Sequence, residues 1–385
     1  MQHETLTSRE RMIRTLNHEP VDRVPFDLGS HLSTGISAFA YWNLREYLGL
    51  SVDNIWIPDC VQFLAYVDED ILQRFHLDCI LLEPRWEKTV KWQPRGKYQF
   101  HIPAAMKPSQ NGYGNWIVRL GTEEMQMPGG GHFFDGDWLQ YWGTGDEDAD
   151  LDLYAREAER IYKETPYATN FVGYGHGEGF SAFFGDINRL VQMLEDPATV
   201  MQENEIRCEE YIHRAGKIID RMGEYIQLIT ITDDMGMQRG PMCKPLIVEQ
   251  CVAPFIKKLC DFIHSNSDIK VFMHNCGSIK PLIPILIDCG VDVLNPVQIS
   301  AADMDPQELK DKFGDEIIFW GGGCDTQNIL GTATPRMVAD HVRELIRIFK
   351  PGGGFVFNQV HNIMGDVPPE NIVAMLDTAY EESFY

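Results

Sequence analysis

Long apolar runs are absent from this sequence: no stretch approaches the roughly 20 residues that a membrane-spanning helix needs. The N-terminus, MQHETLTSRERMIRTL, is polar, which argues against a cleaved secretory signal. Positive charge is scarce, since 33 Lys and Arg against 57 Asp and Glu give a formal net charge of −24. Nucleic-acid binding needs clustered Lys and Arg, so this balance argues against it. We therefore expect a cytoplasmic protein without membrane or nucleic-acid partners, whose acidic surface keeps it soluble or docks a basic partner.

The nine cysteines lack the short, repeated spacing of a disulfide framework. In a chain of 385 residues this favours reduced thiols, a few of which could bind metal. Internal repeats and low-complexity segments are also missing. We expect one domain over residues 1–385.

What the sequence does contain is an alternation of short apolar runs with helical patterns. The runs are near-continuously apolar, as expected for parallel strands buried on both faces. They cover residues 23–29, 79–84, 170–175, 225–234, 269–275, 291–296, 317–322 and 354–359. Amphipathic stretches follow most of them, at 186–194, 198–222, 245–265, 279–289, 305–313, 334–349 and 368–380. Eight such units predict an α/β fold of the (β/α)8 TIM-barrel type, with a doubly wound open sheet as the alternative.

One segment, residues 86–150, breaks this alternation. Residues 86–131 alternate polar and apolar side chains between turn residues, which predicts an antiparallel insertion in the second βα loop. Residues 135–150 are aromatic and acidic, with Trp138, Tyr141 and Trp142 as a candidate lid. We expect the insertion to cap the barrel mouth, and a purely structural flap is the alternative.

Polar, metal-competent side chains gather where the apolar runs end, which is where barrel enzymes place their chemistry. In chain order these are Asp27, His176, Glu178, Asp233, Asp234, His274, Cys276, Asn295, Gln298, Cys324, Asp325, Gln327, Asn358 and His361.

The strongest candidates in this set are metal ligands. In an extended segment His274 and Cys276 face the same side, and imidazole with thiolate is a suitable zinc donor pair. Cys324 follows three glycines at the end of the seventh run, and these would let its thiol turn inward. Three donors predict a Zn2+ site with an open position. We assign Glu178 as a resting fourth ligand, with a carboxylate at the rim as the alternative.

The other candidates receive roles around that metal. Asp234 is the expected catalytic carboxylate, whereas Asp233 fits an N-cap for the following turn. His361 is expected to act in catalysis or on the substrate, and a surface histidine is the alternative. The remaining predicted substrate-binding residues are Asp27, His176, Gln327 and Asn358.

Three blocks carry a resemblance to a known family: MHNCGSIKPLIPILIDCGVDVLNPVQ, FWGGGCDTQ and GGGFVFNQVHNIMGDVPPENIVAML. Together with RVPFDLG and TDDMG, they resemble the uroporphyrinogen decarboxylase superfamily. The resemblance implies a (β/α)8 barrel, often homodimeric, with its active site at the carboxyl ends of the strands.

The resemblance also separates two branches. Porphyrin decarboxylases carry an arginine-rich segment where this chain reads FDLGSHLSTGIS, without arginine. Corrinoid-linked methyltransferases carry an H-x-C motif followed at a distance by cysteine, which His274, Cys276 and Cys324 match. The chain lacks the D-x-H-x-x-G corrinoid signature, so the cobalamin would come from a separate corrinoid protein.

The expected function is therefore zinc-dependent methyl transfer, preferably O-demethylation of an aryl methyl ether onto that cobalamin. The alternatives are methyl-corrinoid:thiol transfer, a uroporphyrinogen-type decarboxylase, or a non-catalytic zinc- or tetrapyrrole-binding protein.

Overall fold

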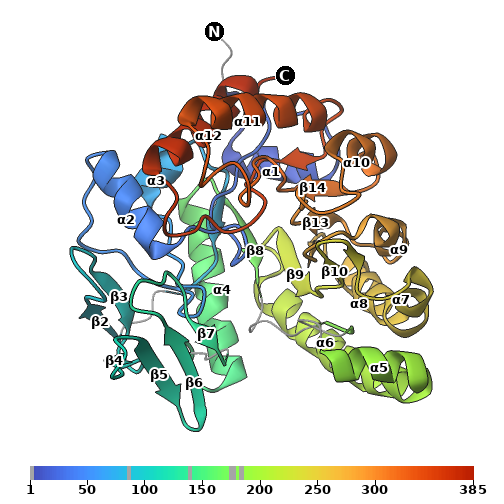
Figure 1. Ribbon diagram of the computed structural model, residues 1–385. Helices are drawn as coiled ribbons and strands as arrows, with labels where there is room; N and C mark the ends of the chain where they lie inside the picture. Colours follow the sequence, from blue (N-terminus) through green and yellow to red (C-terminus); the bar gives the residue numbers. More distant parts are fainter. Residues whose placement is uncertain (1–3, 85–87, 138–140, 173–178, 182–185) are drawn as a thin grey trace.

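A curled, parallel, seven-stranded sheet forms the centre of the computed structural model (Figure 1), which describes residues 4–84, 88–137, 141–172, 179–181 and 186–385. Every pair of neighbouring strands runs parallel, and the strand order across the sheet follows the chain. The strands are β1 (Cys79–Leu81), β8 (Ala168–Phe171), β9 (Leu228–Thr232), β12 (Lys270–His274), β13 (Val293–Asn295), β14 (Ile318–Trp320) and β15 (Phe355–Val356). Seven of the eight predicted runs are therefore confirmed as strands.

The first predicted run, residues 23–29, forms two isolated bridges, at Arg23 and Phe26, in place of a strand. Phe26 pairs in parallel with Phe357 next to β15, and its carbonyl accepts a hydrogen bond from the Asp78 N–H at 2.8 Å, just before β1. Pro25 lacks an N–H group, which limits this segment's capacity to pair as a regular strand. Residue 26 thus links the two edges of the sheet, as in a TIM-like barrel.

Helices cover the outer side of this sheet, and α1 covers one of its ends (Figure 1). They are α1 (Ser8–Leu16), α2 (Ala38–Tyr47), α3 (Glu69–Arg74), α4 (Glu147–Glu164), α5 (Ile187–Glu195), α6 (Pro197–Met222), α7 (Pro245–Cys251), α8 (Ala253–Asn266), α9 (Ile283–Asp288), α10 (Pro306–Phe313), α11 (Pro335–Phe349) and α12 (Pro369–Glu382). A short 3-10 turn at Lys280–Leu282 precedes α9. The amphipathic stretch predicted at 245–265 is split at Val252 into α7 and α8, with Pro254 in the first turn of α8, where a missing N–H costs nothing.

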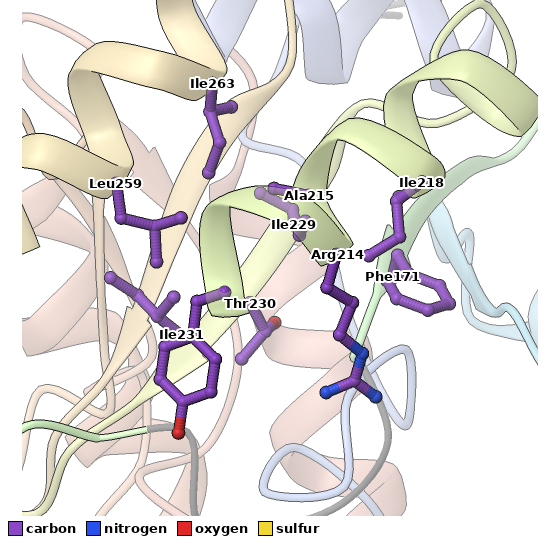
Figure 2. Close-up of a pocket in the computed structure, with 10 residues that line it drawn as sticks. Phe171, Arg214, Ala215, Ile218, Ile229, Thr230, Ile231, Leu259 and Ile263 are labelled. Carbon is purple, nitrogen blue, oxygen red and sulfur yellow. The ribbon is translucent and has the colours of Figure 1, made fainter. Parts of the chain in front are cut away.

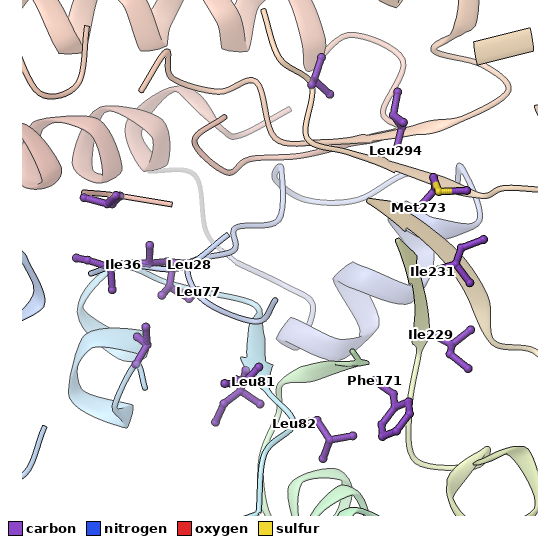
Figure 3. Close-up of a cluster of buried hydrophobic side chains, with 14 of the residues drawn as sticks. Leu28, Ile36, Leu77, Leu81, Leu82, Phe171, Ile229, Ile231, Met273 and Leu294 are labelled. Atoms are coloured by element: carbon purple, nitrogen blue, oxygen red, sulfur yellow. The ribbon is translucent and has the colours of Figure 1, made fainter. Parts of the chain in front are cut away.

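The two faces of the sheet bury separate apolar clusters. The smaller cluster includes residues from all seven strands, such as Leu228 and Phe272, together with Met12 and Leu16 of α1. This is the inside of the curled sheet, covered at one end by α1. The alternate strand residues, among them Ile229, Ile231 and Met273, pack outward in the larger cluster that Figure 3 shows in part. The alternation follows from the two-residue repeat of a strand.

The outer layer is tightly packed. Between β9, α6 and α8 lies a cavity of about 20 Å³, lined mostly by apolar side chains (Figure 2). That volume accommodates about one water molecule. The cavity is a small gap between β9 and the two helices that cover it.

Antiparallel strands lie between β1 and β8 in the chain, within the predicted insertion. They form a two-stranded and a four-stranded sheet, drawn in teal in Figure 1. The strands are β2 (Thr89–Trp92), β3 (Phe100–Pro103), β4 (Ser109–Gln110), β5 (Trp116–Leu120), β6 (Glu123–Met127) and β7 (Asp135–Gly136). A further small antiparallel pair, β10 (Gly236–Met237) and β11 (Gly240–Pro241), follows β9.

All nine cysteines are free thiols. In the described part of the chain, no helix is both long enough and apolar enough to cross a membrane.

Candidate metal centre

His274 is the last residue of β12, and the residue is 4% exposed. Its Nδ1 atom lies 2.9 Å from the Asn295 Oδ1 atom at the end of the neighbouring strand β13. Its Nε2 atom lies 3.3 Å from the Cys276 Sγ atom and 3.4 Å from the Ser33 Oγ atom. The Nδ1 edge of this ring therefore faces Asn295 on the sheet, and the Nε2 edge faces Cys276 and Ser33.

Cys276 follows β12 by two residues and points to the same place as His274, as predicted. Its backbone N–H donates to the Asp234 Oδ1 atom at 2.7 Å, and the same oxygen lies 3.8 Å from the His274 Nε2 atom. Burial, and then the Asp234 carboxylate, raise the pKa of the Cys276 thiol well above its usual value. A cation at this point would oppose both effects and favour the thiolate.

His361, five residues beyond β15, is the third member of this group. The ligand atoms of His274, Cys276 and His361 all lie within 4.8 Å of one another, and no other such group occurs among the residues that the structure describes. The two imidazole rings meet edge to face with centroids 5.9 Å apart. The Asn362 N–H donates to the His361 Nδ1 atom at 2.8 Å, which leaves the proton of a neutral ring on Nε2. Metal binding by this ring would therefore require the loss of that hydrogen bond, whichever nitrogen becomes the ligand. One imidazole pair and one thiol form a donor set that suits zinc.

Cys324, the predicted third ligand, is outside this group. The preceding glycines do bend the chain, with φ of +111° at Gly321 and +76° at Gly322. The bend leaves the Cys324 thiol fully buried, 4.0 Å from the Asp325 carbonyl oxygen. Its carbonyl oxygen accepts from the Val360 N–H at 2.9 Å. The loop after β14 thus supports the backbone next to His361. The metal-free structure brings His361, and not Cys324, together with His274 and Cys276, and the role of Cys324 as a ligand stays a prediction.

Two predicted substrate-binding residues lie inside the barrel. The Asp27 carboxylate is fully buried and accepts hydrogen bonds from the Trp320 Nε1–H and the Ser30 N–H, both at 2.9 Å. Burial raises the pKa of Asp27 above its usual value despite these bonds. The Asn358 amide, also fully buried, donates to the Asp27 carbonyl oxygen at 3.0 Å. Asp27 thus binds β14 through Trp320, and Asn358 binds the backbone of residue 27, so both side chains have partners within the fold.

The remaining predicted residues fall into two groups. Gln327 is exposed, and its N–H donates at 2.8 Å to Asp325, whose carboxylate organises the turn after β14. His176 and Glu178 lie outside the described residues.

Sequence reasoning missed two residues beside His274. Ser33 contacts its Nε2 atom, and the His31 ring stacks on its ring with centroids 5.5 Å apart. Both belong to SHLSTGIS, which follows the first apolar run. A histidine four residues after Asp27, at the end of that run, was the available signal.

A cavity of about 320 Å³ adjoins the donor group, since His361 is one of its lining residues. Its walls come from separate parts of the chain: 61–64, 132–136 and 361–364, with Ser37. Half of the lining side chains are apolar, namely Val61, Leu64, Phe133, Phe134, Ile363 and Met364, and the other half are polar. The insertion therefore contributes residues 132–136 to a cavity beside the donors.

The predicted aromatic lid contributes less. Trp142 packs on Trp56 and donates its indole N–H to the Ile57 carbonyl oxygen at 3.1 Å. Trp138 lies outside the described residues.

Known proteins share parts of this sequence and its fold. Residues 193–382, about half of the chain, match the family model described as uroporphyrinogen decarboxylase (URO-D). The structure of a methyltransferase from Methanosarcina mazei is similar over 98% of this chain and 99% of its own, with a TM-score of 0.59 and 16% identity. At that identity the similarity shows a shared fold.

A sugar phosphate isomerase/epimerase from Parabacteroides distasonis is similar over 64% of this chain and 78% of its own, at 9% identity. Its TM-score of 0.33 is too low to support an argument. No curated protein is similar enough in sequence to count as a match.

Proposed function

The chain belongs to the uroporphyrinogen decarboxylase superfamily, and from that membership we propose that it is a zinc-dependent methyltransferase. In this proposal it moves a methyl group from a small methyl donor to the cobalamin of a separate corrinoid protein. The favoured donor is an aryl methyl ether. The fold shared with the Methanosarcina mazei methyltransferase supports the proposal.

The observation that carries the proposal is the group of His274, Cys276 and His361 at the ends of β12 and β15. Two imidazoles and one thiol fit zinc, and three protein ligands leave a fourth position for substrate, as in catalytic zinc sites. Bound zinc would supply a Lewis acid for the heteroatom that carries the methyl group. The protein's own part is to fix these donors: Asp234 holds the backbone of Cys276, and Asn295 contacts the far nitrogen of His274.

The placement of the N-terminal arginines argues against decarboxylation. Arg11 and Arg23 bind the Asp78 carboxylate at 2.6 and 2.8 Å, with all three side chains at most 1% exposed. Asp78 precedes β1, so these cations lie at the amino end of the sheet, opposite His274. They are thus used within the fold and cannot grip substrate carboxylates at the donor group.

The cavity beside His361 supports a donor with an apolar body. Its apolar side chains favour contact with an aromatic or aliphatic group, and its polar side chains, among them Gln62 and Asp135, offer partners to the polar substituents of such a donor. An aryl methyl ether placed there would have its methyl-bearing oxygen near His361, the donor residue that lines the cavity.

The test combines metal content with methyl transfer. Purified protein should contain about one zinc per chain, since the donor group provides one site. Cys276→Ser and His361→Ala should both lose zinc and the methylation of cob(I)alamin by a methoxylated aromatic compound. Cys324→Ser is the matched control, because it removes a buried thiol outside the donor group and should retain both properties.

Several outcomes would reject all or part of this proposal. Full activity in metal-free protein would exclude zinc. Zinc binding without methyl transfer from any methoxylated aromatic would exclude the aryl ether donor. Loss of zinc in Cys324→Ser but not in His361→Ala would restore the ligand set predicted from sequence.

A further inference from the structure

The environment of His274 contains one feature that the proposed function does not use. A neutral imidazole carries its proton on only one nitrogen, and only the other nitrogen can bind a metal. The donor group needs the lone pair on Nε2, because Cys276 lies on that side of the ring. Something must therefore hold the proton on Nδ1.

The orientation of the Asn295 amide answers this. Its Nδ2 atom lies 2.9 Å from the Trp320 carbonyl oxygen, which can only accept hydrogen bonds. The amide nitrogen must face that carbonyl, so the amide oxygen faces His274. An amide oxygen also only accepts, and the His274 Nδ1 atom at 2.9 Å must therefore carry the proton.

The contacts on the other side of the ring agree with this assignment. The Ser33 hydroxyl and the Cys276 thiol both approach Nε2, and both can donate to a lone pair there. Asn295 and Trp320 are fully buried, so water does not compete for their hydrogen bonds. Trp320 is itself held by its indole bond to Asp27.

From this geometry we infer that Asn295 is the positioning residue for the candidate metal ligand His274. Held by the Trp320 carbonyl, it keeps the imidazole proton on Nδ1 and directs the Nε2 lone pair toward Cys276. The inference rests on the proposed function only for the identity of the metal, since the tautomer is a property of the metal-free protein. It also gives Asp27 a place, at the far end of the chain of contacts that orients His274.

The primary test needs neither metal nor turnover. In metal-free protein labelled with ¹⁵N-histidine and kept above the histidine pKa, NMR should show His274 with its proton on Nδ1. The signal is assigned by its loss in His274→Gln. A proton on Nε2 would overturn the inference, whatever the enzyme does.

Variants test the consequence for the metal. Asn295→Leu removes the acceptor and should weaken Zn2+ binding, measured by chelator competition, by about tenfold to a hundredfold. Asn295→Asp keeps an acceptor for Nδ1–H, so it should retain the tautomer and bind Zn2+ more tightly than Asn295→Leu.

Asn170→Leu is the matched control. Asn170 is a buried amide near the end of β8 whose Oδ1 atom accepts from the Thr230 hydroxyl at 3.0 Å. This substitution should leave Zn2+ affinity unchanged. An equal loss in Asn170→Leu and Asn295→Leu, or no loss in Asn295→Leu, would contradict the inference. Normal Zn2+ binding without methyl transfer in the parent would reject the proposed function alone.

Discussion

Asp233 and Asp234 are adjacent carboxylates with different partners. Asp234 holds the backbone of Cys276, whereas Asp233 accepts hydrogen bonds from the Phe180 and Ser181 N–H groups at 2.8 and 3.1 Å. The sequence favoured Asp233 as an N-cap of the following turn. The Asp233 carboxylate instead binds the backbone of residues 180 and 181, more than 50 residues earlier in the chain. At the neighbouring Gly179, a Cβ atom would clash with this carboxylate.

This position makes stability depend on pH. Burial outweighs the hydrogen bonds from Ser181 and Phe180 and raises the pKa of Asp233 to about 6. The unfolded carboxyl loses its proton near pH 4, so between these values the folded state binds more protons and loses stability as pH rises. Relative to Asp233→Asn, the metal-free parent should lose roughly 1 kcal/mol of unfolding free energy between about pH 5 and about pH 7. The check is the unfolding free energy of both proteins, measured by denaturation at each pH. If it changes equally with pH in the two proteins, the raised pKa of Asp233 is contradicted.

At the scale of elements, the loops after β9 and β12 pack against each other through glycines. Gly277 has φ +91°, and a Cβ atom there would lie 2.5 Å from the Gly236 carbonyl carbon. The Ser278 N–H donates to the Met237 carbonyl oxygen at 2.8 Å across the same contact. The position of Cys276, directly before Gly277, therefore depends on this close approach of two loops.

Gly277→Ala should accordingly affect both stability and metal binding. The clash should move the loop after β12, lower the unfolding free energy by more than about 2 kcal/mol and weaken Zn2+ binding. Gly352→Ala is the control, because Gly352 has φ +78° but open space around it. It should cost only the backbone strain, about 1 kcal/mol, and leave Zn2+ affinity unchanged. Similar losses in the two variants would mean that the loop contact is unimportant.

Much of this element structure could be predicted from sequence. Parallel strands buried on both faces give continuous apolar runs, and the capping residues Asp305 and Thr334 begin α10 and α11 as expected. Helix α2 was missed because its first half, residues 38–42, is continuously apolar and buried, so no polar face marks where the helix begins. The same distinction between local and long-range structure decides how much of the site could be predicted. The direction shared by His274 and Cys276 is local to one strand, whereas the choice between Cys324 and His361 depends on how two distant loops bend.

At the scale of the whole molecule, the two ends of the sheet have opposite character. The carboxyl end gathers the donors and the cavity, and the amino end buries Asp78 with Arg11 and Arg23 beneath α1. The Phe26 N–H also donates to Asp78 at 2.7 Å. The Asp78 carboxylate therefore connects α1 and residues 23–26 to the start of β1, at the point where the two edges of the sheet meet.

Asp78→Ala should be severely destabilising. It leaves two guanidinium groups buried without their shared partner, and breaking such a pair costs about 3–5 kcal/mol. Asp377→Ala breaks the Arg74–Asp377 pair, whose side chains are 41% and 40% exposed, and should cost about 1 kcal/mol or less. Chemical denaturation measures both changes. Equal effects would show that the buried network adds nothing beyond a surface pair.

The cavity beside His361 has a consequence for how this protein could diversify. Residues 132–136 form part of its wall but belong to the antiparallel insertion, which supplies no strand to the central sheet. Under the proposed function, changes in that short stretch would reshape the space beside His361 while the strands of the barrel stay as they are. They would then alter which methyl donors fit without altering the residues that hold the metal.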